Sequence, residues 1–228
     1  MTVPVITVDG PSGAGKGTIS HLLAATLGWH FLDSGALYRV TGQACLIEGV
    51  SWDDHPAVAE VARHLEVSFH TAADGEVLVA YKGIDVSREI RTEEGGRGAS
   101  TVATIPAVRE ALLARQREFR QPPGLVADGR DMGTVVFPGA TLKIFLTASA
   151  RERAERRYRQ LLAKGENVSL PRLLADIEER DARDSSRDVS PLLPAEDALV
   201  IDSTALPIAD VFEQVTVKVR EKGLIDTR

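Results

Sequence analysis

The sequence predicts an α/β fold with a parallel β-sheet, because two patterns alternate along the chain. Short, mainly apolar runs that suit strands occur at residues 3–8, 29–32, 124–128, 142–147 and 198–202, the first of them rich in β-branched residues, and helical segments alternate with them. The 228 residues are 43% hydrophobic and 26% charged, which is enough for a sizeable core and excludes a disordered or collagen-like chain. We expect one or at most two globular domains.

The first predicted strand and helix enclose a glycine-rich turn. Residues 3–8 form a nearly continuous apolar run, which suits a strand buried on both faces. From Lys16, apolar residues recur at spacings of three and four until Gly28, a typical helix C-cap. A second helix is expected at about residues 36–49, after the second strand.

A different pattern interrupts the parallel core. Residues 65–70 alternate apolar and polar side chains, Val77, Val79 and Tyr81 recur at a spacing of two, and the Asp-Gly pair at 74–75 favours a turn between the two segments. Residues 84–86 are a candidate third strand. We interpret residues 55–100 as a small antiparallel insertion at one edge of the core, too small to be an independent domain.

Charge and composition exclude several classes of protein. The net charge of −6 argues against broad binding to DNA or to an anionic membrane, so we expect no nucleic-acid and no membrane partner. Nevertheless 21 of the 27 basic residues are Arg, and nine of these lie between Arg151 and Arg187, which favours a local site for a small polyanion.

The cysteine, the histidines and the N-terminal residues indicate the cellular compartment and bear on zinc binding. The single Cys45 has no partner for a disulfide, and the five scattered histidines give no zinc spacing. The N-terminus has no basic segment before an apolar stretch, and no window approaches the roughly 18 apolar residues of a spanning helix. We therefore expect a cytoplasmic protein.

A phosphate-binding loop is predicted between the first strand and helix. The residues match the pattern G-x-x-x-x-G-K, whose backbone N–H groups surround phosphates while the lysine bridges the terminal ones. The alternative is a glycine-rich loop with an incidental lysine. Gly17 stands where a Ser or Thr would supply the magnesium ligand, so Thr18 is the nearest candidate. The predicted nucleotide-binding residues are Gly10, Pro11, Ser12, Gly13, Ala14, Gly15, Lys16, Gly17 and Thr18.

The loop alone leaves several functions open. A GTPase is excluded because it needs an N-K-x-D motif, and the only asparagine, Asn167, precedes Val168. A kinase, an ATPase and a nucleotide-binding adaptor remain.

Polar residues after two predicted strands favour a second binding site. Ser34, a candidate helix cap, and Arg39 follow the strand predicted at 29–32. Asp128 ends the strand predicted at 124–128, and Arg130 and Asp131 come directly after it. Parallel sheets bind ligands at these strand ends, where a carboxylate suits magnesium and an arginine suits phosphate. The alternatives are an ordinary helix cap with a surface arginine and an ordinary polar turn.

In the C-terminal third of the chain, a helical stripe of apolar residues continues as a stripe of charged residues. The stripe that begins at Leu170 continues at helical spacing as Arg180, Asp184 and Arg187, where a core-facing charge needs a partner or a ligand. The alternative is that the helix ends near Ile177 and a solvated charge run follows.

Five further arginines suggest a lid that closes on a nucleotide. Pairs such as Glu152 with Arg156 could also be surface support alone. The five are Arg151, Arg153, Arg156, Arg157 and Arg159.

The sequence resembles the bacterial cytidylate kinase family over nearly its whole length. The resemblance rests on residues 9–18, 33–39, 108–110, 128–138 and 179–181, whereas the glycine-rich run at 94–98 is unusual for a helix. It implies a P-loop fold with a five-stranded parallel sheet flanked by helices, a small antiparallel β insertion and a short helical lid. The implied parts of this single domain are a core at about 1–54, 101–150 and 169–228, an acceptor-binding insertion at about 55–100 and a lid at about 151–168.

The resemblance also implies an activity and its residues. It implies a monomer that transfers the γ-phosphoryl group of ATP, with Mg²⁺, to CMP or dCMP. Lys16, Arg130, Arg187 and Asp128 would be catalytic, and Arg156 and Arg157 would join the loop in binding ATP. Ser34, Arg39, Arg130 and Arg187 would hold the acceptor phosphate, Arg180 and Asp184 the sugar, and Ser100, Arg109 and Asp131 the base.

Overall fold

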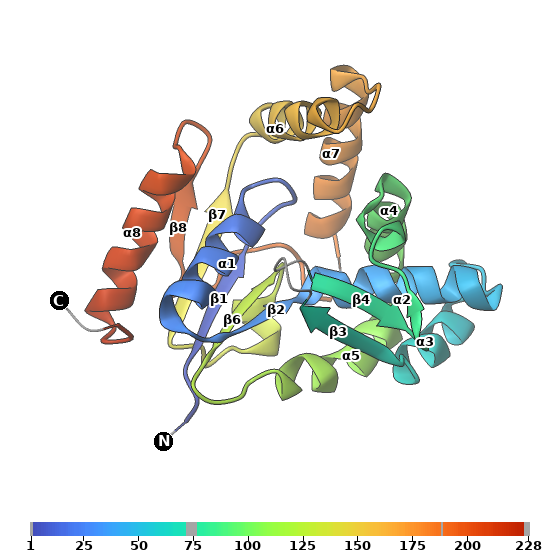
Figure 1. Ribbon diagram of the computed structural model, residues 1–228, viewed down its shortest axis with the longest axis horizontal. Coiled ribbons are helices and arrows are strands. Elements are labelled where there is room, and N and C mark those ends of the chain that lie inside the picture. The colour runs from blue at the N-terminus through green and yellow to red at the C-terminus, as the bar shows by residue number, and fades with distance from the viewer. Residues whose placement is uncertain (1, 72–76, 188, 226–228) are drawn as a thin grey trace. The chain divides into compact units, whose positions relative to one another are not determined.

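The computed structural model describes residues 2–71, 77–187 and 189–225 and contains two compact units. One unit comprises Met1–Asp33 and Arg117–Arg228, and the other comprises Ser34–Gln116. In the first unit, five parallel strands form one sheet in the order β2-β6-β1-β7-β8, which confirms the predicted core (Figure 1). The strands are β1 (Val5–Asp9), β2 (His30–Asp33), β6 (Leu125–Gly129), β7 (Leu142–Thr147) and β8 (Leu199–Asp202).

The central strand β1 explains why the sequence shows an apolar run there instead of an alternating pattern. Every residue of β1 is buried, since β6 and β7 flank it and other elements cover both faces. Ile6 shares one core cluster with Ile19 of α1 (Lys16–Leu27) and Val215 of α8 (Ile208–Glu221). This packing holds the start of α1 at the carboxyl end of β1.

The C-terminal part of this unit contains two packed helices, α6 (Ala150–Ala163) and α7 (Leu170–Ser185). Ala154, Leu161 and Leu173 form their buried contact. Because α7 continues to Ser185, the ionic stripe is helical up to Asp184, and the alternative of a helix that ends near Ile177 is wrong. A π-helical turn at Met132–Val136, after β6, was not predicted.

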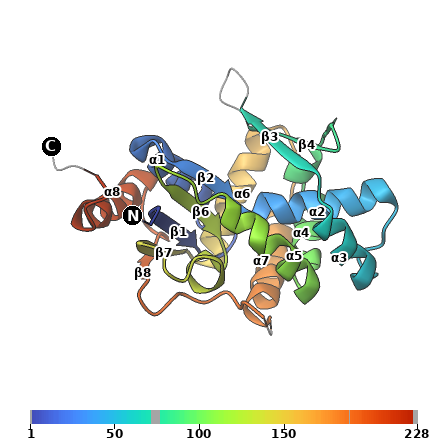
Figure 2. The ribbon, with the colours of Figure 1, turned by 90° about the horizontal axis from the view of Figure 1, so that it is seen from below.

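The second unit combines helices with the predicted antiparallel hairpin. Its strands pair in the order β3-β4-β5, as expected, although the predicted turn at 74–75 lies outside the described residues. Figure 2 shows α2 beside α3 and α4, with which it packs. The elements are α2 (Ser34–Glu48), α3 (His55–Arg63), β3 (Val67–Thr71), β4 (Val77–Tyr81), β5 (Ile84–Asp85), a 3₁₀ turn (Glu89–Arg91), α4 (Glu93–Val102) and α5 (Pro106–Glu118), whose last two residues belong to the first unit.

The glycine-rich run at 94–98 lies within the regular helix α4. Glycines suit these positions because α4 packs very closely on its neighbours. A Cβ at Gly98 would lie 2.6 Å from Cζ2 of Trp52, and one at Gly42 of α2 would lie 3.1 Å from the Gly98 carbonyl carbon. Larger side chains would separate α2 from α4. The glycines therefore position α4 and its buried Ser100.

Candidate functional site

The predicted phosphate loop occupies the connection between β1 and α1. Gly10, Gly13 and Gly15 all have positive φ angles, of 143°, 80° and 95°, a backbone region that glycine adopts without strain. At Gly10 a Cβ would also lie 1.9 Å from the carbonyl oxygen of Leu146, so this position requires glycine. Gly15 precedes the helix and has no side chain to cap it, which leaves first-turn N–H groups for an anionic ligand.

Lys16 is the first residue of α1 and is only 6% exposed. Its Nζ donates a hydrogen bond to the Pro11 carbonyl oxygen at 3.0 Å and lies 3.7 Å from Oδ1 of Asp128. Burial, followed by the positive charge of Arg130, lowers the pKa of Lys16 to about 8, although Asp128 opposes this shift. A second positive charge is thus close to Lys16, and an anion there would be strongly attracted.

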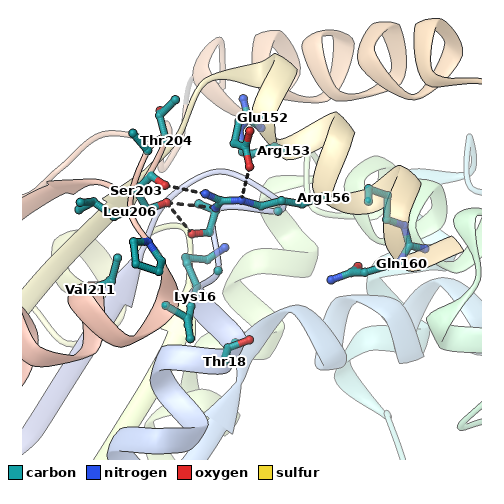
Figure 3. Close-up of a pocket in the computed structure, with 18 of the residues that line it drawn as sticks. Lys16, Thr18, Glu152, Arg153, Arg156, Gln160, Ser203, Thr204, Leu206 and Val211 are labelled. Atoms are coloured by element: carbon teal, nitrogen blue, oxygen red, sulfur yellow. Dashed lines mark hydrogen bonds and ion pairs between the residues drawn. The ribbon is translucent and has the colours of Figure 1, made fainter. Parts of the chain in front are cut away.

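A cavity of about 830 Å³ adjoins the phosphate loop, α6 and the segment at 203–208. Figure 3 shows the Arg156 side chain reaching from α6 toward Ser203. Its Nε donates to Oε1 of Glu152 at 3.0 Å and its Nη2 donates to the Ser203 carbonyl oxygen at 2.6 Å. The Ser203 hydroxyl in turn donates to the Ala14 carbonyl oxygen at 3.1 Å. Ser203, directly after strand β8, thereby adds a polar wall to the cavity that sequence reasoning missed; the signal was a serine directly after a predicted strand.

Several predicted nucleotide-binding residues line this cavity together. They come from the loop, α1 and α6, and they are Gly13, Ala14, Gly15, Lys16, Gly17, Thr18, Arg156 and Arg157. With Arg153 and Arg159, which also line it, the cavity combines backbone N–H groups, a lysine and four arginines, a set suited to a polyphosphate.

A second cluster of charges includes Asp184 on α7. Asp184 is 1% exposed, accepts from Nε of Arg130 at 3.0 Å and forms an ion pair with Arg187. Burial opposes its ionisation, but Arg130, Arg187 and Arg180 together hold its pKa below the usual range. The carboxylate thus holds the two arginines in place, and Asp184 and Arg187 of the ionic stripe are partners of each other.

Asp9 anchors the segment that follows β6, and sequence reasoning assigned it no role. Its Oδ1 accepts from the Met132 N–H at 2.8 Å and its Oδ2 from the Gly133 N–H at 2.7 Å. Burial, which these hydrogen bonds only partly oppose, raises the pKa of Asp9 to about 7. Because Asp131 immediately precedes these amides, Asp9 also positions it, and the only sequence signal was an acid at the end of a buried strand.

The other predicted acceptor residues lie in the second unit. Ser34 was expected to cap α2, but this is wrong, since it is the first helical residue and its hydroxyl donates to Oε1 of Gln116 at 2.7 Å. Arg109 is buried, donates to the Ala103 carbonyl oxygen at 3.3 Å and lies 5.7 Å from the ring centroid of Tyr38. Arg39 lies on α2 and Ser100 on α4.

The arginine cluster of α6 does not act as one group. Arg151 is exposed and pairs with Glu155, whereas Arg153 is 3% exposed and pairs with Asp181. Four of the five arginines line the cavity, namely Arg153, Arg156, Arg157 and Arg159. Arg151 does not line it, and Arg153 uses its guanidinium to pair with Asp181 of α7.

The donor groups near Lys16 suit Mg²⁺ bound together with a nucleotide. A Cβ at Gly17 would lie 3.6 Å from Oδ2 of Asp128, so that carboxylate borders the turn that carries Thr18. Among the described residues no group of three or more His, Cys, Asp or Glu side chains could hold a metal by itself. Mg²⁺ keeps several waters and uses one or two protein ligands plus phosphates, a role for which Asp128 has the right chemistry.

In the described part of the chain, no helix is both long and apolar enough to cross a membrane.

Comparisons with known proteins identify one family of similar sequences. The sequence profile of the family described as cytidylate kinase matches residues 6–221. A cytidylate kinase of Aeromonas hydrophila is 60% identical over 212 residues, which cover 93% of this chain and 92% of that protein. One of Stutzerimonas stutzeri is 56% identical over 223 residues, 97% of each chain. Among solved structures, a gluconokinase from Sinorhizobium meliloti aligns with a TM-score of 0.49 and 18% identity, over 96% of this chain and 92% of that one.

Proposed function

Because the chain belongs to the cytidylate kinase family, we propose that it transfers the γ-phosphoryl group of ATP to CMP or dCMP and releases ADP with CDP or dCDP. The observation that carries this proposal is the ion pair of Lys16 with Asp128 at 3.7 Å, because Arg130 follows Asp128 by two residues and pairs with the buried Asp184 at 3.0 Å. Phosphoryl transfer needs donor and acceptor phosphates in line and their charges neutralised, and this cluster supplies positive charge beside the phosphate loop.

We assign ATP, the phosphoryl donor, to the cavity beside the phosphate loop. The phosphate loop and Lys16 bind the ATP phosphates, and Arg156 and Arg157 contact the nucleotide from α6. Mg²⁺ would be held by Thr18 and Asp128, directly or through water, and would neutralise phosphate charge. We propose that residues 151–168 form a lid that excludes water, which otherwise could accept the phosphoryl group.

The acceptor roles follow the family resemblance. Arg130, Arg187, Ser34 and Arg39 bind the acceptor phosphate, Arg180 and Asp184 bind the sugar, and Ser100, Arg109 and Asp131 bind the base. No general base is required, because the attacking phosphate oxygen is already ionised. The buried Asp184 pairs with Arg130 and Arg187, so these arginines are preorganised before substrate arrives.

An acceptor panel tests the proposed specificity. We expect kcat/KM with ATP and Mg²⁺ to be highest for CMP and dCMP, and lower by orders of magnitude for UMP, AMP and GMP. ADP release that is the same with and without any acceptor would indicate an ATPase, and highest activity with UMP would assign a different base.

Replacing Asp131 with Ala is expected to reduce activity on CMP far more than on UMP. Cytosine presents an N4 amino donor where uracil presents an O4 acceptor, and a carboxylate can accept only from the former. The ratio of the two kcat/KM values should fall by roughly 10²-fold or more. An unchanged ratio would show that Asp131 only orients neighbouring groups, even if total activity fell.

The pH dependence of ATP capture should report Lys16. Its pKa of about 8 in the free protein means that the ammonium form is lost as pH rises through this value. We expect kcat/KM for ATP to decline above about pH 8, whereas kcat should decline at higher pH because bound phosphates favour the charged form. A value of kcat/KM that stays constant up to pH 10 would contradict this assignment.

A further inference from the structure

Arg153, on the first turn of α6, is charged but only 3% exposed. Its Nε donates to the Ala148 carbonyl oxygen at 2.9 Å, and its Nη1 donates to the Ser12 carbonyl oxygen at 3.1 Å. Nη1 also donates to Oδ1 of Asp181 at 3.1 Å, and Nη2 donates to Oδ2 of the same carboxylate. One guanidinium therefore joins the segment after β7, the phosphate loop and α7.

The phosphate loop also packs directly on Arg153. A Cβ at Gly13 would lie 3.2 Å from the Cβ of Arg153 and 3.7 Å from its carbonyl oxygen. The Ser12 carbonyl is hydrogen-bonded to the side chain of this residue, and a side chain at Gly13 would press on its Cβ. A displacement of Arg153 would therefore displace the loop.

Asp181 lies on the same helix as Asp184, whose partners Arg130 and Arg187 we assign to the acceptor phosphate. Asp181 precedes Asp184 by three residues on α7, and residues at this spacing neighbour each other on a helix. Asp184 binds Arg130 and Arg187. A helix moves as a nearly rigid element, so the pair of Arg153 with Asp181 links the loop at one end to these two arginines at the other.

We propose that Arg153 and Asp181 are positioning residues that set the distance and alignment between the donor and acceptor phosphates. The proposal rests on the proposed function. Neither residue needs to contact a substrate, because the effect is transmitted through Ser12 and Asp184. A misplacement of about 1 Å between reacting groups can cost on the order of 10²-fold in rate without a comparable loss of binding.

The test uses two conservative variants, Arg153→Lys and Asp181→Asn. Lysine keeps the charge but cannot replace a fork that bonds two carbonyls and both carboxylate oxygens. We expect kcat to fall by roughly 10- to 100-fold in each variant, while calorimetry shows the affinities for MgATP alone and CMP alone within about threefold of wild type. The double variant should be little worse than the more impaired single variant, because the residues act as a pair.

The matched control is Arg183→Lys on α7, the helix that carries Asp181, since Arg183 pairs at 2.6 Å with the exposed Glu179; its kcat should not change. A kcat within twofold of wild type in both variants would overturn the proposal, and so would equal losses in kcat and both affinities, which indicate a merely structural brace. If Arg153→Lys does not fold, Asp181→Asn decides by the same criteria. A wild-type protein inactive toward CMP would overturn the proposed function as well.

Discussion

The variant Lys16→Met is expected to fold and bind CMP but to lose phosphoryl transfer almost completely. Lys16 supplies the positive charge at the phosphate loop, and methionine has similar length without charge. Removal of one preorganised donor at developing charge typically costs 10²- to 10³-fold in kcat, and we expect a loss of about this size or larger. Steady-state turnover with saturating MgATP and CMP measures it.

Stability provides the control for this variant. Burial lowers the pKa of Lys16, so the ammonium group is held at a cost in the folded protein. The melting temperature of Lys16→Met should therefore be equal to or above that of wild type. The exposed Lys218, which pairs with Glu221 on α8, gives the matched variant Lys218→Met, whose turnover should be unchanged. Near-wild-type turnover in Lys16→Met would refute the phosphate-loop assignment.

Arg130→Ala and Arg187→Ala are each expected to lower kcat/KM for CMP by about 2 to 4 kcal/mol, or roughly 30- to 1000-fold. Each change removes a contact to the acceptor phosphate and leaves the buried Asp184 with one cation fewer. The control is Arg183→Ala on the same helix, because Arg183 pairs with the exposed Glu179 and should be nearly neutral.

Varying each substrate in turn distinguishes an effect of the arginine variants on CMP from an effect on ATP. Kinetics with CMP varied at saturating ATP, and with ATP varied at saturating CMP, show which nucleotide each arginine serves. A variant that raises only the KM for ATP would place its arginine on the donor side. Adding Asp184→Asn to Arg130→Ala should restore part of any lost stability, since it removes the uncompensated buried charge.

The core of the fold could be predicted from local sequence patterns. The strand β7 has the predicted bounds of residues 142–147, because mainly apolar runs, here interrupted only by Lys143, mark strands buried on both faces. The hairpin follows from alternation, and α7 follows from a stripe that stays periodic as it changes from apolar to ionic. In each case the signal is contained in the segment itself.

The missed features all depend on partners distant in sequence. No periodicity indicates that Arg153 would bond Ser12 and Asp181, so it was grouped with arginines that line the cavity. Ser34 looked like a helix cap because its partner, Gln116, lies 82 positions away. Asp9 is similar, since its two amide donors belong to a π-helical turn that residue types do not reveal.

The central claim is that the phosphoryl group passes from ATP to a cytidine monophosphate and not to water. The most direct measurement follows the label of γ-³²P-ATP during incubation with wild-type protein, Mg²⁺ and CMP. We predict that the label appears in CDP in equal amount to the ADP formed, and that omission of CMP nearly stops ADP release. Label recovered as inorganic phosphate at the same rate with and without CMP would contradict the account.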